Sequence, residues 1–262
     1  MDLPLTIIPA DLLSQYRKSF DDTAVDNFNN LHDSELSLET FSFYTSVSAI
    51  YSSKIEGEDI ELDSYIKHKR FGVKYMPNHT QKIDDLYNTY LYAQSNKLTP
   101  ENLMHAHELL TKNILDEQHR GQLRKNNMFV MTSDGKIEYV AAVPSIVGDE
   151  MQKFYQDLKT LLQANLKFSE VLFFAAMLHL VFVKIHPLDD GNGRTARLLE
   201  KWFLAEKLGG KAWFIQSEKH YYDNHSIYYS NLRKLGLEYP ELNYTKALEF
   251  VLMLPSSLEQ SG

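Results

Sequence analysis

The sequence predicts a mainly α-helical fold, a helical bundle that carries one β-hairpin. Apolar residues recur at spacings of three and four along most of the 262-residue chain, as on the buried face of a helix. The exception is one segment in which two β-rich runs flank an Asp-Gly pair. The chain is long enough to bury a sizeable core. It shows no repeat or long polar linker, so we predict a single, mostly helical domain.

The first predicted helices lie in the N-terminal half. The stretches "LETFSFYTSVSAIYSSKIEG" and "QKIDDLYNTYLYAQS" both have helical apolar spacing, and Gly57 is a natural stop for the first. In "LTPENLMHAHELLTKNIL", Thr99 is a candidate N-cap, Pro100 suits the first helical position and Glu101 suits the first turn. A third helix is expected from there.

The predicted hairpin pairs 128–131 with 137–140. Asp134-Gly135 lies between these runs and matches the chemistry of a tight hairpin turn. An exposed edge of such a hairpin can pair with an extended segment of another protein through main-chain hydrogen bonds. A hairpin that merely covers the core would have the same spacing.

Three helical patterns follow the hairpin, beginning with an amphipathic helix introduced by Pro144 and Ser145. The second is "SEVLFFAAMLHLVFVKI", with Ser169 as its expected cap. Its most apolar run, 171–183, is shorter than the roughly 20 residues of a membrane span, so we expect a helix buried on all sides. Since a residue before proline leaves the helical region, His186 is expected on a turn just past this helix. The third is "RTARLLEKWFLAEKLGG", and "SEKHYYDNHSIYYSNLRKLG" predicts one further helix.

Composition excludes several classes of protein. The chain has 35 acidic and 27 basic residues, and the formal net charge of −8 argues against general binding to nucleic acid or anionic lipid. There is no cysteine, hence no disulfide, thiolate metal site or cysteine nucleophile. The N-terminus lacks the features of a secretory signal, so we expect a cytoplasmic protein.

The stretch "HPLDDGNGRTAR", which begins at His186, combines the parts of a phosphate site. Gly191-Asn192-Gly193 precedes a helix, where unpaired backbone N–H groups and the helix dipole favour an anion. Arg194 and Arg197 are three residues apart and can together hold a polyphosphate. This stretch lacks the spacing and the lysine of a P-loop.

The same stretch offers a base and a metal ligand. His186 can accept a proton from an incoming hydroxyl group. Mg²⁺, which usually accompanies a triphosphate, prefers one or two carboxylates, so Asp190 is the natural ligand and Asp189 the weaker candidate. Taken singly, each feature is more typical of an ordinary turn, helix end or solvated surface. Their conjunction favours transfer from a nucleotide.

These residues resemble the signature of the Fic family, His-Pro-Phe-x-Asp/Glu-Gly-Asn-Gly-Arg-x-x-Arg, with Leu188 in place of phenylalanine. "GQLRKNNMFV" and the hairpin are similar to the family's flap, and "DNHSIYYSNL" is similar to its Asn-Arg-x-x-Tyr-Tyr element, with His225 replacing the arginine. The resemblance covers about 98–235. It suggests an N-terminal helical region at 1–96, a Fic core at 97–236 and a C-terminal helical tail at 237–262.

The resemblance implies an enzyme that moves AMP from ATP to a Ser, Thr or Tyr hydroxyl of a target protein or of itself, with Mg²⁺ as cofactor. His186 would be the base and Asp190 the metal ligand. Implied contacts with ATP come from Gly191, Asn192, Gly193, Arg194, Arg197, Asn224 and Tyr229, and the implied target-docking flap contains Phe129, Val130, Met131, Tyr139 and Val140.

A second motif, "SSKIEG", resembles the family's inhibitory helix. Ser52 and Glu56 are four residues apart and share a helix face. The resemblance implies that Glu56 pairs with Arg197, takes the place of the γ-phosphate and holds ATP in an unproductive pose. We also expect a homodimer that keeps this helix in place.

Several alternatives stay open at this stage. The same loop could transfer UMP, phosphocholine or phosphate, or remove AMP from a modified protein. A non-catalytic nucleotide-binding module is a further alternative, although it would need no histidine base. A DNA-binding regulator is disfavoured because little chain follows Leu235. We therefore expect neither nucleic acid nor a membrane as a partner.

Overall fold

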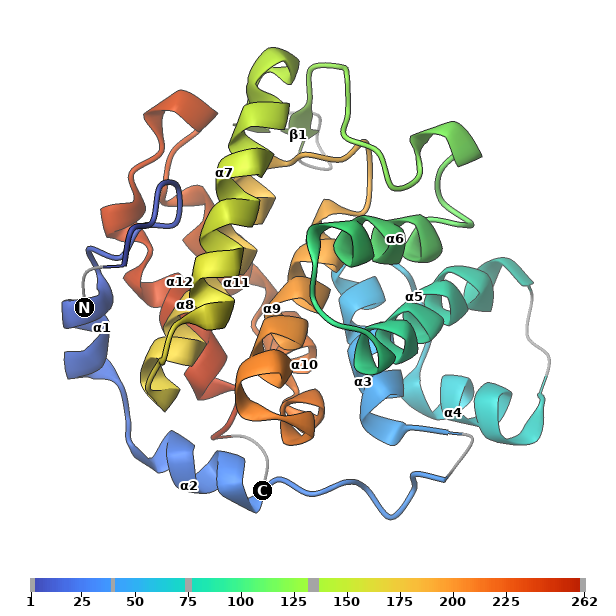
Figure 1. Ribbon diagram of the computed structural model, residues 1–262. Coiled ribbons are helices and arrows are strands. Elements are labelled where there is room, and N and C mark those ends of the chain that lie inside the picture. The colour runs from blue at the N-terminus through green and yellow to red at the C-terminus, as the bar shows by residue number, and fades with distance from the viewer. Residues whose placement is uncertain (1–2, 39–40, 74–76, 132–136, 260–262) are drawn as a thin grey trace.

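The computed structural model describes residues 3–38, 41–73, 77–131 and 137–259. These residues form a helical bundle with one two-stranded antiparallel sheet, which confirms the predicted fold class (Figure 1). The α-helices are α1 (Leu13–Ser19), α2 (Thr23–Asn30), α3 (Phe43–Ile55), α4 (Leu62–Phe71), α5 (Pro77–Ser95), α6 (Pro100–Leu110), α7 (Pro144–Gln163), α8 (Phe168–Ile185), α9 (Asn192–Leu208), α10 (Ser217–Asp223), α11 (His225–Arg233) and α12 (Leu248–Ser256). Short 3₁₀ segments are η1 (Glu117–His119), η2 (Gly210–Phe214), η3 (Tyr239–Glu241) and η4 (Tyr244–Lys246).

The central helix α8 packs against α9, α7 and α12, and 83% of it is buried inside the fold. By length and composition alone it is the one helix among the described residues that could span a membrane, but here it is the core of the bundle. The expected cap at Ser169 is wrong: α8 begins one residue earlier, at Phe168. Lys167 is the N-cap, and its backbone N–H donates to the Glu170 carboxylate at 2.7 Å. A carboxylate satisfies this N–H group in place of a serine hydroxyl.

The N-terminal helices join the same core. One cluster of buried apolar side chains contains residues from Ile8 to Leu258, so both ends of the described chain contribute to it. The predicted helix starts and stops are present where the caps indicated: Thr99 Oγ1 accepts from the N–H of Asn102, and α3 ends just before Gly57. The three helices α1, α2 and α4 were not predicted individually. The proposed domain boundaries stay predictions.

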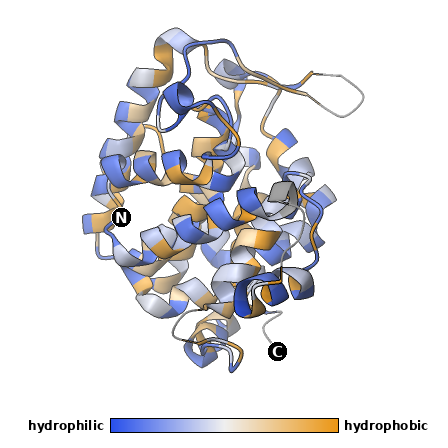
Figure 2. Cartoon of the chain, turned by 90° about the vertical axis from the view of Figure 1, so that its right-hand side faces the viewer, coloured by the Kyte–Doolittle hydropathy of each residue, from blue (hydrophilic) through white to orange (hydrophobic). Residues whose placement is uncertain are grey.

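The hairpin consists of β1 (Phe129–Met131) and β2 (Ile137–Val140), as predicted. Phe129 pairs with Val140, and an irregularity follows Val130. The Asp134-Gly135 turn lies outside the described residues. The strands project from the bundle (Figure 2). Phe129 and Met131 on β1 have exposed apolar side chains.

Two helix boundaries differ from prediction. Helix α9 begins at Asn192, after Gly191 in the left-handed conformation (φ +76°), so Asn192 and Gly193 belong to its first turn. The stretch expected to form one helix after 216 is two, α10 and α11, separated at Asn224. Asn224 is non-helical, with φ −109° and ψ 34°, and its side chain donates to the carbonyl of His220.

Candidate active site

The loop between α8 and α9 presents the candidate base. His186 ends α8 with φ +52°, the left-handed region that a non-glycine residue seldom adopts. Its backbone N–H donates to the carbonyl of Phe182 at 3.0 Å, which closes the helix. Pro187 follows and cannot continue the helix, so the histidine lies on a turn, as expected.

The side chain of His186 is held as a neutral base. Its Nδ1 contacts the carbonyl oxygen of Val183 at 3.1 Å, and since a carbonyl only accepts, Nδ1 carries the proton. The lone pair is then on Nε2, which bonds to no other described residue. Burial, together with the nearby charge of Arg124, lowers the pKa of His186 to about 4. The imidazole is therefore unprotonated at neutral pH and can accept a proton.

Arg124 clamps the loop that carries His186. This side chain is 2% exposed and donates to four main-chain carbonyls: His186 at 2.6 Å, Asn126 at 2.7 Å, Ile185 at 3.4 Å and, closer still, Ala142. The arginine thus ties the end of α8 to the end of the hairpin. The sequence did not single out Arg124, because its partners are backbone groups that no side-chain pattern reveals.

Asn192 and Leu188 brace the loop from inside. The Asn192 side chain accepts from the N–H of Leu188 at 3.0 Å and donates to its carbonyl at 2.8 Å. Leu188 is fully buried and provides the apolar anchor that the sequence led us to expect. Because both ends of the Asn192 amide are engaged within the loop, its side chain shapes the loop here, and its contact with phosphate stays a prediction.

Gly191 is packed too closely for a side chain. A Cβ atom at this position would lie 3.0 Å from Thr111 Cγ2 and 3.1 Å from Leu110 Cδ1, and its φ is positive. His107, which the sequence did not assign to the site, bonds through Nε2 to the carbonyl of Asp190 at 3.0 Å. Its Nδ1 accepts from the N–H of Gly121 at 2.9 Å. The loop therefore rests on α6.

Arg197 forms the centre of an anion site. It is 1% exposed and donates to Ser52 Oγ at 2.9 Å, to the Ser52 carbonyl at 3.0 Å and to Glu56 Oε1 at 2.6 Å. The expected pairing of Glu56 with Arg197 is therefore present. Burial disfavours the charged forms of both Glu56 and Arg197. For Glu56 the positive charges of Arg197 and Arg194 outweigh burial, so its pKa is lowered. Glu56 in turn outweighs burial at Arg197, whose pKa is raised.

The Glu56 carboxylate lies directly against the glycine of the loop. A Cβ atom added at Gly193 would collide with Glu56 Oε1 and would lie 3.1 Å from Arg197 Nη1. Because glycine has no side chain, residue 193 leaves room for an anion at the start of α9, and the Glu56 carboxylate oxygen lies in that space. The groups around it, the Arg197 guanidinium and the start of α9, would also suit a phosphate oxygen.

Arg194 and Asp190 lie beside this anion site. Arg194 is 5% exposed, and it donates to Asp190 Oδ1 at 3.1 Å. Its buried Nε has no hydrogen-bond partner among the described residues, so a donor is left for an anion. The described residues contain no group of three or more His, Cys, Asp or Glu that could hold a metal ion. The Asp190 side chain is 51% exposed and can supply one carboxylate to an ion that phosphate oxygens also hold.

A recess joins the base, the anion site and the hairpin. Of the predicted site residues it contains His186, Gly193, Arg197, Glu56, Val130, Tyr139 and Tyr229. It also contains Tyr228, one of the tyrosines that the sequence offered for a nucleotide pocket, and residues that the sequence did not single out: Glu138, Val183, Lys184, Leu232 and Arg233. Asn224 does not line this recess. Val130, Tyr229 and Leu232 give the recess apolar surface beside its charged groups, which suits the base and sugar of a nucleotide.

The hairpin has one edge engaged and one edge free within the described residues. The N–H of Val140 donates to the carbonyl of Leu237 at 2.8 Å, so β2 is partly paired on its outer side. Tyr139 is 5% exposed, and its hydroxyl donates to the carbonyl of Lys184 at 2.6 Å. The Tyr139 side chain is thus buried against α8 and not displayed for docking, in contrast to Phe129 and Met131 on β1.

The fold is a helical bundle, and its candidate site combines a neutral histidine with an anion site of the kind that suits phosphate. Residues 97–204 match the model of the Fic/DOC family. This part of the chain is therefore a Fic domain, as the signature at His186 indicated.

Two curated relatives share part of this region. A protein named uridine 5'-monophosphate transferase from Xanthomonas campestris is 41% identical over 86 residues, which are 32% of this chain and 16% of that protein. A protein named protein adenylyltransferase Fic from Nematostella vectensis is 30% identical over 115 residues, 43% of this chain and 24% of the relative. The matches therefore span less than a quarter of either relative.

Solved structures of Fic proteins share the fold. A Fic family protein from Desulfovibrio desulfuricans has a TM-score of 0.74 at 21% identity, over all of this chain and 76% of that one. Fic-1 from C. elegans has a TM-score of 0.68 at 18% identity, over 95% of this chain and 72% of the other.

Proposed function

We propose that this protein transfers AMP from ATP to a Ser, Thr or Tyr hydroxyl of a target protein and of itself. The observation that carries the proposal is the anion site at Arg197, which lies in one recess with the unprotonated Nε2 of His186. The Fic domain and the names of its two curated relatives support nucleotidyl transfer as the reaction class.

Each side chain has a part in this reaction. His186 Nε2 takes the proton of the target hydroxyl, whose oxygen attacks the α-phosphorus as pyrophosphate leaves on the opposite side. Arg194 and Arg197 hold the β- and γ-phosphates, together with backbone N–H groups at the start of α9. Asp190 would hold Mg²⁺, which supplies positive charge to the phosphate oxygens.

We further propose that the structure represents an inhibited state. The Glu56 carboxylate neutralises Arg197 and occupies space beside Gly193 that a terminal phosphate would need. A phosphate placed there would meet a negative charge at close range. The homodimer, the cytoplasmic location and the lack of nucleic-acid and membrane partners also remain proposals.

The test uses the Glu56→Gly variant with Mg²⁺ and ATP that is labelled at either the α- or the γ-phosphate, alone and with cell lysate. His186→Ala in the same background is the control. Label from the α-phosphate only, lost without His186, is the expected result. Label from the γ-phosphate would make the protein a kinase, and label from neither would refute AMP transfer.

UMP transfer is the competing candidate, because the 41% identical relative is named a uridine 5'-monophosphate transferase. The same assay with α-labelled UTP distinguishes the two donors. A stronger signal from UTP than from ATP at equal concentrations would replace AMP by UMP in the proposal. The role of His186 would be unchanged.

A further inference from the structure

Helices α3 and α9 meet in a regular series of contacts. Ser48 contacts Lys201, Ser52 contacts Arg197, and the Glu56 side chain lies against Gly193. From one contact to the next, the residue number rises by four on α3 and falls by four on α9. The two helices are therefore antiparallel neighbours in one fixed register, and Glu56 is the last contact of the series.

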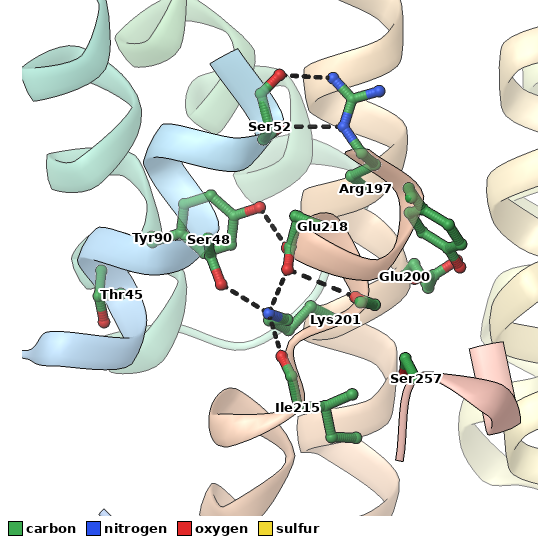
Figure 3. A network of polar contacts seen from close by, with 12 residues as sticks. Thr45, Ser48, Ser52, Tyr90, Arg197, Glu200, Lys201, Ile215, Glu218 and Ser257 are labelled. Atoms are coloured by element: carbon green, nitrogen blue, oxygen red, sulfur yellow. Dashed lines mark hydrogen bonds and ion pairs between the residues drawn. The ribbon is translucent and has the colours of Figure 1, made fainter. Parts of the chain in front are cut away.

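The contact farthest from the recess is a buried ionic cluster around Lys201 (Figure 3). Its ammonium donates to Ser48 Oγ at 2.6 Å, to the Ile215 carbonyl at 2.6 Å and to the Glu218 carboxylate. Glu218 also accepts from the hydroxyl of Tyr90 at 2.7 Å. The side chains of Lys201 and Glu218 are fully buried, and the three ammonium protons have three acceptors.

Such a cluster resists displacement. A buried ammonium that loses an acceptor, or a buried carboxylate that loses a donor, has no water to replace the lost partner. Ser48 is thereby fixed to α9, with Ile215 after η2, Glu218 of α10 and Tyr90 of α5 as further anchors. A shift of α3 along α9 would break the contact between Ser48 and Lys201.

The position of Glu56 follows from that anchor. Glu56 is eight residues from Ser48, about two helical turns and roughly 12 Å along the axis of α3. The helix transmits its position rigidly over this distance, so the register set at Ser48 decides whether the Glu56 carboxylate reaches Arg197. Lys201 lines no part of the recess and does not touch the anion site.

We propose that Lys201, paired with Glu218 and bonded to Ser48, is a positioning residue that holds the inhibitory helix α3 in the register that places Glu56 at Arg197. This inference rests on the proposed function, because it gives the regulation of the same site. If the cluster only stabilised the fold, disrupting it would have the same effect whether Glu56 is present or absent.

The first test compares Ser48→Ala with Ser53→Ala. Both serines are buried in α3, but Ser53 Oγ has no hydrogen-bond partner among the residues that the structure describes, so its removal breaks no hydrogen bond to α9. We expect Ser48→Ala to increase α-phosphate labelling roughly ten- to a hundredfold, the range for one hydrogen bond to a charged group. In the Glu56→Gly background the same change should have no effect. An equal change in both backgrounds, or none where Glu56 is present, would overturn the proposal.

The second test needs no nucleotide. Amide hydrogen exchange in the last turn of α3 should be faster in Ser48→Ala than in Ser53→Ala by a similar factor. Glu218→Gln, which keeps the shape of the side chain and removes its charge, should act in the same direction. Equal exchange in all these variants and the parent would refute the positioning role. If the Glu56→Gly variant uses no nucleotide donor, only the proposed function is refuted. The amide-exchange comparison would still decide whether Lys201 positions α3.

Discussion

Glu56 Oε1 lies 2.6 Å from Nη2 of Arg197, across 141 residues of sequence. The Arg197 side chain is 1% exposed and that of Glu56 is 29% exposed, so the pair lies between the core and the recess. An internal anion thus holds the arginine that would bind a substrate phosphate. Moving the Glu56 carboxylate away from Arg197 would change the charge of the site and leave the core in place.

The first prediction concerns nucleotide affinity. Glu56→Gln removes the negative charge and keeps the size of the side chain, so we expect Mg²⁺–ATP to bind about tenfold more tightly, a change of about 1.4 kcal/mol. Isothermal titration calorimetry measures this difference. Glu58→Gln is the matched control, because Glu58 pairs with Lys82 at 2.6 Å and lies outside the recess. Equal affinities in the two variants would contradict electrostatic inhibition.

The pH behaviour of His186 gives a second prediction. Burial and the charge of Arg124 lower its pKa to about 4, so the ring should remain neutral down to about pH 5. NMR titration of labelled histidine rings measures this, with the His186 signal assigned by its loss in His186→Ala. A titration midpoint near 6.5, the ordinary value, would show that the ring is solvated.

The same pKa predicts how stability changes with pH. Between about pH 6.5 and 4 the unfolded chain binds a proton at His186 that the folded chain does not. Stability from this group is therefore present above the ordinary pKa and is lost as pH falls through the window. The melting temperature of the parent should fall more between pH 7 and 4.5 than that of His186→Ala. Parallel decreases in both proteins would argue against a buried neutral ring.

Much of the fold could be predicted from the sequence because long helices repeat their apolar spacing many times. Helices α3, α8 and α9 are of this kind, and the Thr99 cap and Gly57 stop are local signals. The short helices α1, α2 and α4 have too few turns to show such a repeat. Proximity across long separations is also invisible to spacing, so the pairing of Glu56 with Arg197 came from family resemblance.

Arg124 and Lys201 show why part of the site could not be foreseen. Arg124 binds carbonyl oxygens, which every residue has, so no pattern of side chains indicates its partners. Lys201 lies among the apolar residues of α9, where a charge is normally placed on the solvent side. Its partner Glu218 belongs to another helix, and the two side chains meet in a fold in which α9 and α10 both pack against α3.

The fourth prediction tests the clamp at Arg124. Lysine cannot reach several carbonyls with one planar group, so Arg124→Lys should leave buried acceptors unpaired and reduce the free energy of unfolding by about 2–4 kcal/mol. Urea denaturation measures this loss, and labelling in the Glu56→Gly background should also fall. Arg120→Lys is the control, since within the described residues the Arg120 side chain makes one hydrogen bond, to the Leu115 carbonyl at 2.8 Å. Similar losses in the two variants would mean that Arg124 is not a clamp.

The last prediction separates the anion site from the stability of the fold. Gly193 lies in the first turn of α9 without a positive φ, so alanine suits its backbone. In the Glu56→Gly background, where the carboxylate that the new Cβ would meet is absent, Gly193→Ala should therefore leave the melting temperature unchanged or higher. The added Cβ would nevertheless occupy the space beside Arg197, where the phosphate must enter. We therefore expect Gly193→Ala to reduce labelling by on the order of a hundredfold, even in the Glu56→Gly background.

Two other glycines provide comparison variants for Gly193→Ala. Gly148→Ala on α7 should change nothing, because no described atom beyond the neighbouring backbone of its own helix lies within 4 Å of the new Cβ. Gly191→Ala should reduce both stability and labelling, since its φ is +76° and Thr111 Cγ2 would be 3.0 Å away. Thermal unfolding and labelling of all three variants distinguish the cases. If Gly193→Ala retains the labelling of its parent, phosphate does not bind against this glycine, and the anion that Glu56 imitates lies elsewhere.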